Sequence, residues 1–366
     1  MNYFLYLPVL FLLLSANKYD SPVGMSTNRT FLPDHDLIAY QGRTEIRDKN
    51  TAALIGSASS VNMAFKGEYC ELLLSGAFDH HNYIHLELDG KYLGRMKIEG
   101  LVKPIKIQAE SQTEIHHLSV YKATEAASGA ILFHKVMAQE LIPIAGHPKK
   151  TIEFIGNSIT CGALSDSSQM PCDQGEYLDH HNAYMAYGPQ LARALNVNFV
   201  LSSVSGIGMY RNWNDENIEE PIMPQVYENL YLNTDTTMSY VPAVKPDITS
   251  ICLGTNDMSE GDGIKARLPF DSKKFTENYI NFVQLIYRRY PDTKIVLMNS
   301  PMLTGENNEI LMTCLRKVQS NFVDKKIEFF EFDQNYVDGC SYHPSVADHK
   351  AMASRLTPFF NRLLTD

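Results

Sequence analysis

The sequence predicts two structural parts in one chain, an all-β sandwich or jelly roll over residues 30–145 and an α/β domain with a parallel sheet over residues 150–366. Short apolar runs alternate with turn residues in the first part, and strands alternate with helical segments in the second. Between them, residues 141–148 contain two prolines and a glycine, which predicts a linker. A chain of 366 residues is also long enough for two domains.

The first residues are typical of a secretory signal. An apolar run reaches Leu14 and is followed by the small residues Ser15 and Ala16. No Lys or Arg precedes the run, which is unusual for such a signal. The run is short for a membrane span, and no cysteine follows it to take a lipid. We therefore expect residues 1–16 to be a signal peptide and the protein to be secreted or periplasmic, without a stable membrane anchor.

The first part is expected to contain short strands at near-regular spacing. Asp89-Gly90 predicts a tight hairpin between two of them, because both residue types accept the backbone of a two-residue turn. This spacing favours a sandwich or jelly roll. The apolar runs lie at 53–56, 61–65, 72–74, 83–88, 92–93, 96–98 and 115–121.

The second part alternates between buried strands and helices that are apolar on one face. Such an alternation predicts a parallel sheet covered on both faces, with any ligand at the carboxyl ends of the strands. Strands are expected at 152–155, 198–201, 247–253, 294–298 and 327–330, and helices at 184–195, 275–286, 310–322 and 346–364.

Charge and metal-ligand spacing exclude some partners. The net charge of −10 gives no general attraction for nucleic acid. The clusters Asp79-His80-His81 and Asp179-His180-His181 lack further ligands at metal spacing, so each is expected to be a polar loop. We therefore expect no metal and no cofactor.

Three of the six cysteines lie in segments assigned to the active site. These are Cys161, Cys172 and Cys340. An exported protein could join two of them in a disulfide, and the sequence leaves open which two.

Polar residues follow successive strands of the predicted parallel sheet. Ser158 follows the first strand, Gly206 the second and Asn256 the third, while His343 precedes the last helix. A serine hydroxyl needs a base to become a nucleophile, and acyl transfer needs donors for the oxyanion. We expect Ser158 to be the nucleophile and His343 the base, with the Ser158 N–H, the Gly206 N–H and the Asn256 amide as oxyanion donors.

Four segments resemble the blocks of the SGNH (GDSL-like) hydrolases, in the order typical of that family. They are Gly156-Asn-Ser-Ile, Ser205-Gly206, Gly254-Thr-Asn-Asp and His343-Pro344. The resemblance covers residues 150–364 and implies a flavodoxin-like fold with the catalytic roles given above. Gly156 is expected to relieve the backbone of the tight turn before Ser158.

The N-terminal part resembles carbohydrate esterase family 2. The segments that carry this resemblance are 42–44, 56–57, 65–67, 86–90 and, after the second block, 210–213. It implies a serine esterase that removes O-acetyl groups from polysaccharides such as xylan or mannan through an acetyl-serine intermediate. The implied partner is an acetylated carbohydrate.

One departure from the SGNH pattern concerns the third member of a catalytic triad. Those enzymes commonly have Asp three residues before the histidine, where this chain has Cys340. Either Asp338 reaches the imidazole, or a backbone carbonyl orients it and the enzyme uses a Ser–His dyad, which the family 2 resemblance favours. Trp213 and Tyr342 are candidate sugar platforms, although either could equally pack internally.

The sequence is compatible with two alternative functions. The same catalytic residues would serve a lipase or thioesterase, because the pocket sets the acyl length and the sequence does not reveal the pocket. A non-catalytic glycan-binding protein is the other alternative, and the intact set of catalytic residue types argues against it.

Overall fold

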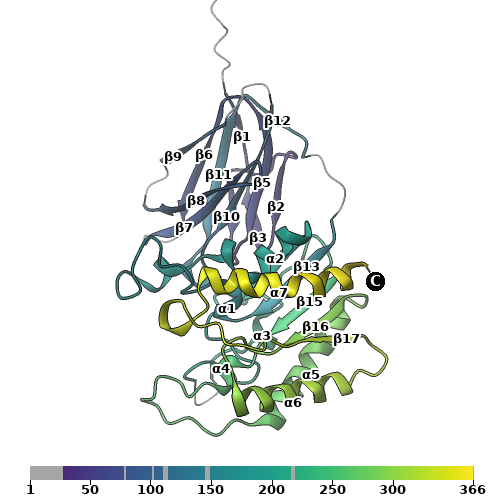
Figure 1. Cartoon of the computed structure of the whole chain (residues 1–366). Coiled ribbons are helices and arrows are strands. Elements are labelled where there is room, and N and C mark those ends of the chain that lie inside the picture. Colours follow the sequence, from purple (N-terminus) through teal and green to yellow (C-terminus); the bar gives the residue numbers. More distant parts are fainter. Residues whose placement is uncertain are drawn as a thin grey trace, which may run out of the picture.

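The computed structural model describes residues 28–77, 80–100, 103–109, 114–144, 149–215 and 219–365. The chain forms two parts that stack end to end, with the β-sandwich at the top of Figure 1 and the α/β part below it. The predicted signal peptide, Asp79 and residues 145–148 of the expected linker lie outside the described residues.

The N-terminal part consists of two antiparallel sheets whose inner faces share one apolar core. One sheet has the order β3-β4-β11-β6-β9 with β1 beside β11, and the other has the order β12-β5-β10-β7-β8 with β2 beside β5. Both sheets contribute to the core, for example Leu72 from one and Val61 from the other. The strands are β1 (Arg29–Phe31), β2 (Ile38–Gln41), β3 (Thr44–Asp48), β4 (Thr51–Leu54), β5 (Ser60–Lys66), β6 (Tyr69–Gly76), β7 (Asn82–Leu88), β8 (Lys91–Ile98), β9 (Lys103–Gln108), β10 (Ile115–Lys122), β11 (Ile131–Ala138) and β12 (Glu140–Ile142).

The hairpin prediction at Asp89-Gly90 is confirmed. These two residues connect β7 to β8 with φ of 54° and 76°, the left-handed pair that a tight hairpin requires. The predicted linker is wrong at its start, because Leu141 is buried in β12, which pairs with β5. Leu141 and Ile142 directly precede Pro143, so the sequence pattern does not separate them from the loop, although they belong to the sheet.

The C-terminal part is a parallel sheet with helices on both faces. Its order, β14-β13-β15-β16-β17, is the flavodoxin-like order in which the first strand lies between the second and third, so the predicted fold class is confirmed. The strands are β13 (Thr151–Gly156), β14 (Asn198–Ser203), β15 (Ile248–Cys252), β16 (Lys294–Met298) and β17 (Ile327–Phe330).

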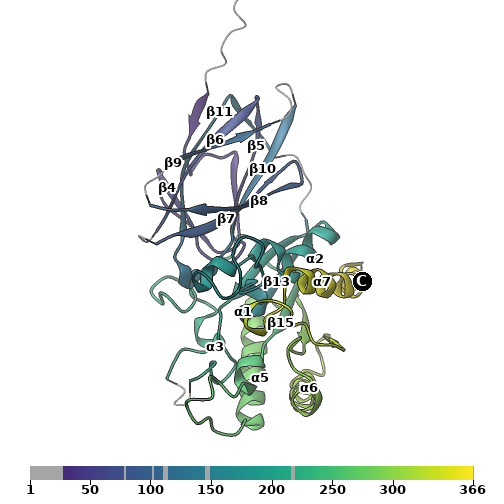
Figure 2. The ribbon, with the colours of Figure 1, turned by 60° about the vertical axis from the view of Figure 1, so that its left-hand side comes forward.

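Two long helices cover each face of this sheet. α2 (Tyr187–Leu195) packs against α7 (Val346–Thr365) on one face, and α5 (Ser272–Arg289) packs against α6 (Gly305–Ser320) on the other. Figure 2 shows the two pairs on opposite sides of the strands. Short helices α1 (Ser158–Cys161), α3 (Met223–Val226) and α4 (Thr255–Met258) lie in the connections. Tyr184, expected in the first helix, instead lies in the 3₁₀ turn η3 (Ala183–Met185) before α2.

The two parts share a buried interface. Ile55 of the sandwich belongs to the same apolar cluster as residues of α5 and α6. Arg43, which is fully buried, donates to the carbonyl of Asn229 at 2.6 Å and to that of Tyr227 at 2.8 Å. A cation held this far inside the neighbouring part fixes the orientation of the sandwich on the parallel sheet.

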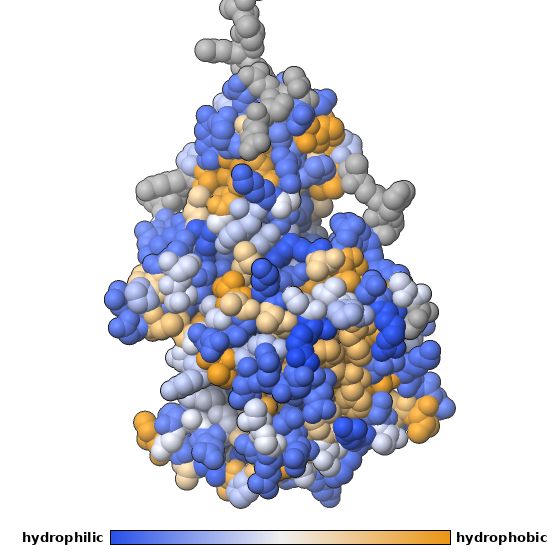
Figure 3. Space-filling view, viewed as in Figure 1, coloured by the Kyte–Doolittle hydropathy of each residue, from blue (hydrophilic) through white to orange (hydrophobic). Residues whose placement is uncertain are grey.

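The outer surface is predominantly polar in the view of Figure 3, where apolar side chains form separate groups. Within the described residues, no helix is both long and apolar enough to cross a membrane.

Candidate active site

Ser158 lies at the first residue of α1, directly beyond the carboxyl end of β13. The side chain of Asn157 caps this helix by accepting the N–H of Ile159 at 3.1 Å. Gly156 is required for space, because a Cβ there would lie 2.0 Å from Oγ1 of Thr160. Our expectation that Gly156 relieves the backbone is therefore wrong, since the described positive-φ glycines do not include it.

His343 faces the serine from the turn before α7. Its Nε2 lies 3.0 Å from Oγ of Ser158, although the two residues are 185 positions apart in the chain. Burial lowers the pKa of His343 below its ordinary value of 6.5 and outweighs the carbonyl of Ser341, which raises the pKa. The imidazole is therefore neutral at neutral pH, and it is ready to accept the serine proton.

The carbonyl of Ser341 contacts the second ring nitrogen of His343, where the carboxylate of a catalytic triad would lie. It lies 3.2 Å from Nδ1 of His343. Asp338 is exposed, and its own backbone N–H donates to the carboxylate of Asp348 at 2.9 Å. Of the two partners weighed from the sequence, the backbone carbonyl is the one in contact with the ring.

The expected oxyanion donors come from the ends of three neighbouring strands, β14, β13 and β15. Gly206 adopts a left-handed φ of 75°, and its carbonyl accepts the N–H of Trp213 at 2.7 Å. The amide of Asn256 donates one hydrogen to the carbonyl of Ile207 at 2.8 Å, which leaves its second hydrogen for a ligand. Ser158 and Asn256 are each 7% exposed, so a small group can reach them while most water is excluded.

Asp257 joins two of the loops that carry these donors. Its carboxylate accepts the N–H groups of Met209 and Tyr210 at 2.9 and 2.8 Å and lies in the buried interior. Burial raises the pKa of Asp257 to about 6, although these hydrogen bonds act to lower it. Asp257 therefore braces the loop after β14 against the loop after β15.

Three aromatic side chains lie around the site and retain exposed surface. Trp213 is 46% exposed and Tyr342 is 79% exposed, so neither packs in the core. Tyr177 is 46% exposed and donates its hydroxyl hydrogen to Oγ of Ser205 at 2.9 Å. The sequence predicted Trp213 and Tyr342 as candidates, whereas no motif marks Tyr177.

A disulfide joins Cys172 to Cys340, and the pairing left open by the sequence is thereby answered. Cys340 is the residue that replaces the expected aspartate, three positions before His343. Cys161, the third candidate, is a buried free thiol 3.2 Å from Oγ of Ser203.

The histidine clusters have protein partners within the described residues. His81 lies 2.6 Å from the carboxylate of Asp179, which also accepts the hydroxyl hydrogen of Tyr83. His180 contacts the carbonyl of Gln174, and His181 contacts that of Tyr177. No group of three potential metal ligands occurs in the described part of the chain.

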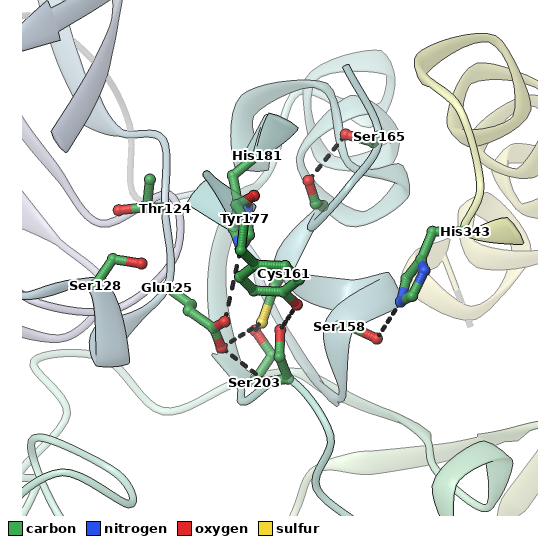
Figure 4. Close-up of polar contacts among 12 residues, drawn as sticks. Thr124, Glu125, Ser128, Ser158, Cys161, Ser165, Tyr177, His181, Ser203 and His343 are labelled. Atoms are coloured by element: carbon green, nitrogen blue, oxygen red, sulfur yellow. Dashed lines mark hydrogen bonds and ion pairs between the residues drawn. The ribbon is translucent and has the colours of Figure 1, made fainter. Parts of the chain in front are cut away.

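Glu125 is a second residue near the site that no sequence motif marks. It belongs to the sandwich, and its carboxylate accepts the N–H of Ser205 at 2.7 Å (Figure 4). Its segment carries no motif, so only the folded structure shows that it reaches the site.

Comparison with known proteins identifies relatives of both parts. Residues 154–351 match the GDSL-like lipase/acylhydrolase family, and residues 40–148 match the carbohydrate esterase 2 N-terminal domain. The resemblances drawn from the sequence blocks are therefore confirmed.

Individual relatives align over most of this chain. It is 28% identical over 337 residues to the cellulase/esterase CelE of Acetivibrio thermocellus, covering 89% of this chain and 39% of that protein. It is 27% identical over 302 residues to an acetylxylan esterase/glucomannan deacetylase of Cellvibrio japonicus, covering 80% of this chain and 81% of that protein. A family two carbohydrate esterase from Clostridium thermocellum, solved with cellohexaose, aligns with a TM-score of 0.78 at 28% identity, covering 90% of this chain and 99% of that chain.

Proposed function

Because the chain belongs to the GDSL-like lipase/acylhydrolase family, we propose that it is a carbohydrate O-acetylesterase, which removes acetyl groups from hemicellulose such as xylan or mannan. The observation that carries this proposal is the 3.0 Å contact between Oγ of Ser158 and Nε2 of His343. The match of residues 40–148 to a carbohydrate esterase domain supports a sugar ester as substrate.

In the first half-reaction, Oγ of Ser158 attacks the acetyl carbonyl carbon while Nε2 of His343 takes the hydroxyl proton. The carbonyl electron pair moves onto oxygen, and the oxyanion accepts hydrogen bonds from the Ser158 N–H, the Gly206 N–H and the Asn256 amide. Collapse of this intermediate breaks the bond to the sugar oxygen, which receives the proton from His343. The products are a free sugar hydroxyl and acetyl-serine.

In the second half-reaction, a water molecule attacks the acetyl-serine carbonyl, and His343 takes a proton from that water. The same donors stabilise the second oxyanion. The intermediate then expels Oγ of Ser158, which takes the proton from His343, and acetic acid leaves and ionises to acetate in solution.

We assign the third role to a backbone group, which makes the catalytic unit a dyad. The carbonyl of Ser341 accepts the Nδ1–H of His343, so it keeps Nε2 free of hydrogen in the resting state. A carbonyl carries a partial charge, so it stabilises the imidazolium less than a carboxylate would.

We assign the sugar-binding role to the exposed aromatic side chains Trp213 and Tyr342, together with Tyr177. Aromatic rings offer a flat apolar face to a pyranose ring and cost little conformational entropy when a ligand binds. Two relatives support a carbohydrate ligand, since one is named a glucomannan deacetylase and another was solved with cellohexaose.

We also propose that the protein is exported. The apolar N-terminal run has the form of a secretory signal, and a disulfide is stable in an oxidising compartment.

Acetate release from acetylated xylan, glucomannan and pectin, with the deacetylated positions assigned by NMR, tests the function. We expect release from hemicellulose, and we expect Ser158→Ala to lower turnover by about 10⁶-fold without changing the unfolding temperature, because the nucleophile is lost. Turnover by Ser158→Ala equal to the unaltered enzyme would reject the serine mechanism. A series of 4-nitrophenyl esters tests acyl length, and a preference for long chains over acetate would reject the deacetylase assignment.

A further inference from the structure

A buried glutamate of the sandwich contacts the loop that carries an oxyanion donor. Glu125 precedes the 3₁₀ turn η1 (Ala126–Ser128) and is 4% exposed. Its Oε2 accepts the N–H of Ser205, the residue directly before Gly206. Figure 4 shows its carboxylate on the sandwich side of Cys161, with the Ser158–His343 pair on the other side.

A buried lysine fixes the backbone that carries Glu125. Nζ of Lys122 donates to the carbonyl and Oγ1 of Thr124 at 2.9 and 2.8 Å and to the carbonyl of Glu125 at 2.5 Å. Burial lowers the pKa of Lys122 to about 7. Oγ1 of Thr124 donates in turn to the side chain of Asn82 at 2.6 Å. These contacts leave the main chain at Glu125 little freedom to move.

The chain around Gly206 is held at three points. Glu125 accepts the N–H of Ser205, and Tyr177 donates to the hydroxyl of that serine at 2.9 Å. The carbonyl of Gly206 accepts the N–H of Trp213 at 2.7 Å. The Gly206 N–H belongs to the peptide group that joins Ser205 to Gly206, so its direction depends on how Ser205 is held. Glu125 therefore acts on the residue directly before the donor, not on the donor itself.

Glu125 is suited to this contact because it is ionised. Burial alone raises its pKa, but His181 and the donors of Ser205 outweigh that effect and bring the pKa below its ordinary value. His181 lies 3.6 Å from the other carboxylate oxygen. A hydrogen bond to a buried carboxylate is shorter and stronger than one between neutral groups.

We propose that Glu125 is a positioning residue for the oxyanion hole, whose carboxylate holds the Ser205–Gly206 segment so that the Gly206 N–H points at the developing charge. Oxyanion donors accelerate acyl transfer only when their direction is fixed before the reaction. The inference rests on the proposed function, since it concerns the same reaction. It means that the sandwich contributes to kcat through a residue that does not touch the substrate.

Substitutions of similar size at Glu125 test the inference. Glu125→Met removes the acceptor, whereas Glu125→Gln keeps an acceptor oxygen. With 4-nitrophenyl acetate we expect Glu125→Met to lower kcat by about 10²-fold with KM within about twofold. We expect a smaller loss in Glu125→Gln, because its amide keeps an acceptor oxygen but not the charge. Glu87→Gln is the matched control, because Glu87 also joins the sandwich to the α/β part, through the hydroxyl of Tyr184 at 2.5 Å, and has no contact with Ser205. It should keep the unaltered kcat.

Three outcomes would overturn the inference: an unchanged kcat in Glu125→Met, equal losses in the Met and Gln variants, or a change in KM alone. Circular dichroism and thermal unfolding verify that each variant folds. If Glu125→Met does not fold, Glu125→Asp retains the charge and withdraws the carboxylate by one methylene, and an unchanged kcat there overturns the inference equally. Inactivity of the unaltered enzyme and of Glu87→Gln on every ester would instead reject the proposed function.

Discussion

Ser158 and His343 lie in contact, but different interactions hold the two segments that carry them. Ser158 lies in a loop beyond a buried strand, and His343 lies in a turn at the surface. Ser158 and the proposed donors beside it lie at the ends of adjacent buried strands, and backbone N–H groups that donate to the carboxylates of Asp257 and Glu125 brace their loops. The histidine turn lies at the surface, where Ser341 and the following tyrosine are exposed and have left-handed φ of 50° and 61°.

A covalent bond compensates for the exposed position of the histidine turn. The disulfide to Cys172 ties Cys340 to a segment 168 residues earlier in the chain. The backbone N–H of Cys340 donates to the carbonyl of Leu164, and that of Val346 donates to the carbonyl of Ser165, so both ends of the turn are attached to the segment after α1. Buried packing therefore orders the proposed nucleophile and its donors, whereas a cross-link and main-chain hydrogen bonds hold the proposed base.

The largest effect predicted by this comparison is on the serine side. Asn256→Ala removes one of the proposed oxyanion donors, so we expect kcat for 4-nitrophenyl acetate to fall about 10²–10³-fold with little change in KM. Steady-state kinetics measures this, with the unfolding temperature as the control for structure. A change in KM at constant kcat would show that Asn256 binds the ground state instead.

A smaller effect is expected from the histidine side. The double variant Cys172→Ala/Cys340→Ala removes the cross-link but keeps the backbone contacts, so we expect kcat to fall about tenfold through a less well-ordered base. The free energy of unfolding should fall by about 2–4 kcal/mol, because the unfolded chain loses a constraint. Urea unfolding and kinetics on the same samples test both, and full activity in the double variant would show that the backbone contacts suffice.

The smallest effect is expected at Asp338. Asp338→Asn should change kcat by less than about twofold, whereas loss of a true triad aspartate costs about 10⁴-fold. The pH profile adds a second measurement. The base must be neutral, and burial lowers its pKa, so activity in both proteins should persist as the pH falls through 6.5 and decline only below the lowered pKa.

Acid unfolding limits the range of that pH experiment. His85 and His349 are fully buried, and burial lowers the pKa of each to about 3. Below pH 6.5 the unfolded chain binds protons at these sites that the folded chain does not bind, so stability decreases toward low pH. Thermal unfolding at each pH separates this loss from titration of His343.

The sequence predicted the elements that carry strong local patterns. Periodicity placed β13 to β17 and the long helices, and the four blocks predicted that Ser158 and His343 would meet. Strands without clear alternation were missed, including edge strand β9, whose Pro104 is tolerated there, and β11, whose register shifts between Phe133 and Lys135. Glu125 and Tyr177 were missed because their roles depend on contacts between distant segments.

Arg43 makes it difficult to separate the β-sandwich from the α/β part in an engineered or recombined gene. Its guanidinium extends from the sandwich to the carbonyls of Tyr227 and Asn229. Burial raises the pKa of Glu153 above its ordinary value, and the charge of Arg43 opposes that rise. A gene fragment ending between the two halves would deprive that glutamate of the Arg43 charge and uncover the apolar surface around Ile55. The unit that can be fused to other modules or exchanged between genes is therefore the β-sandwich and the α/β part together. A fused module would be attached before the sandwich or after the α/β part, and not between them.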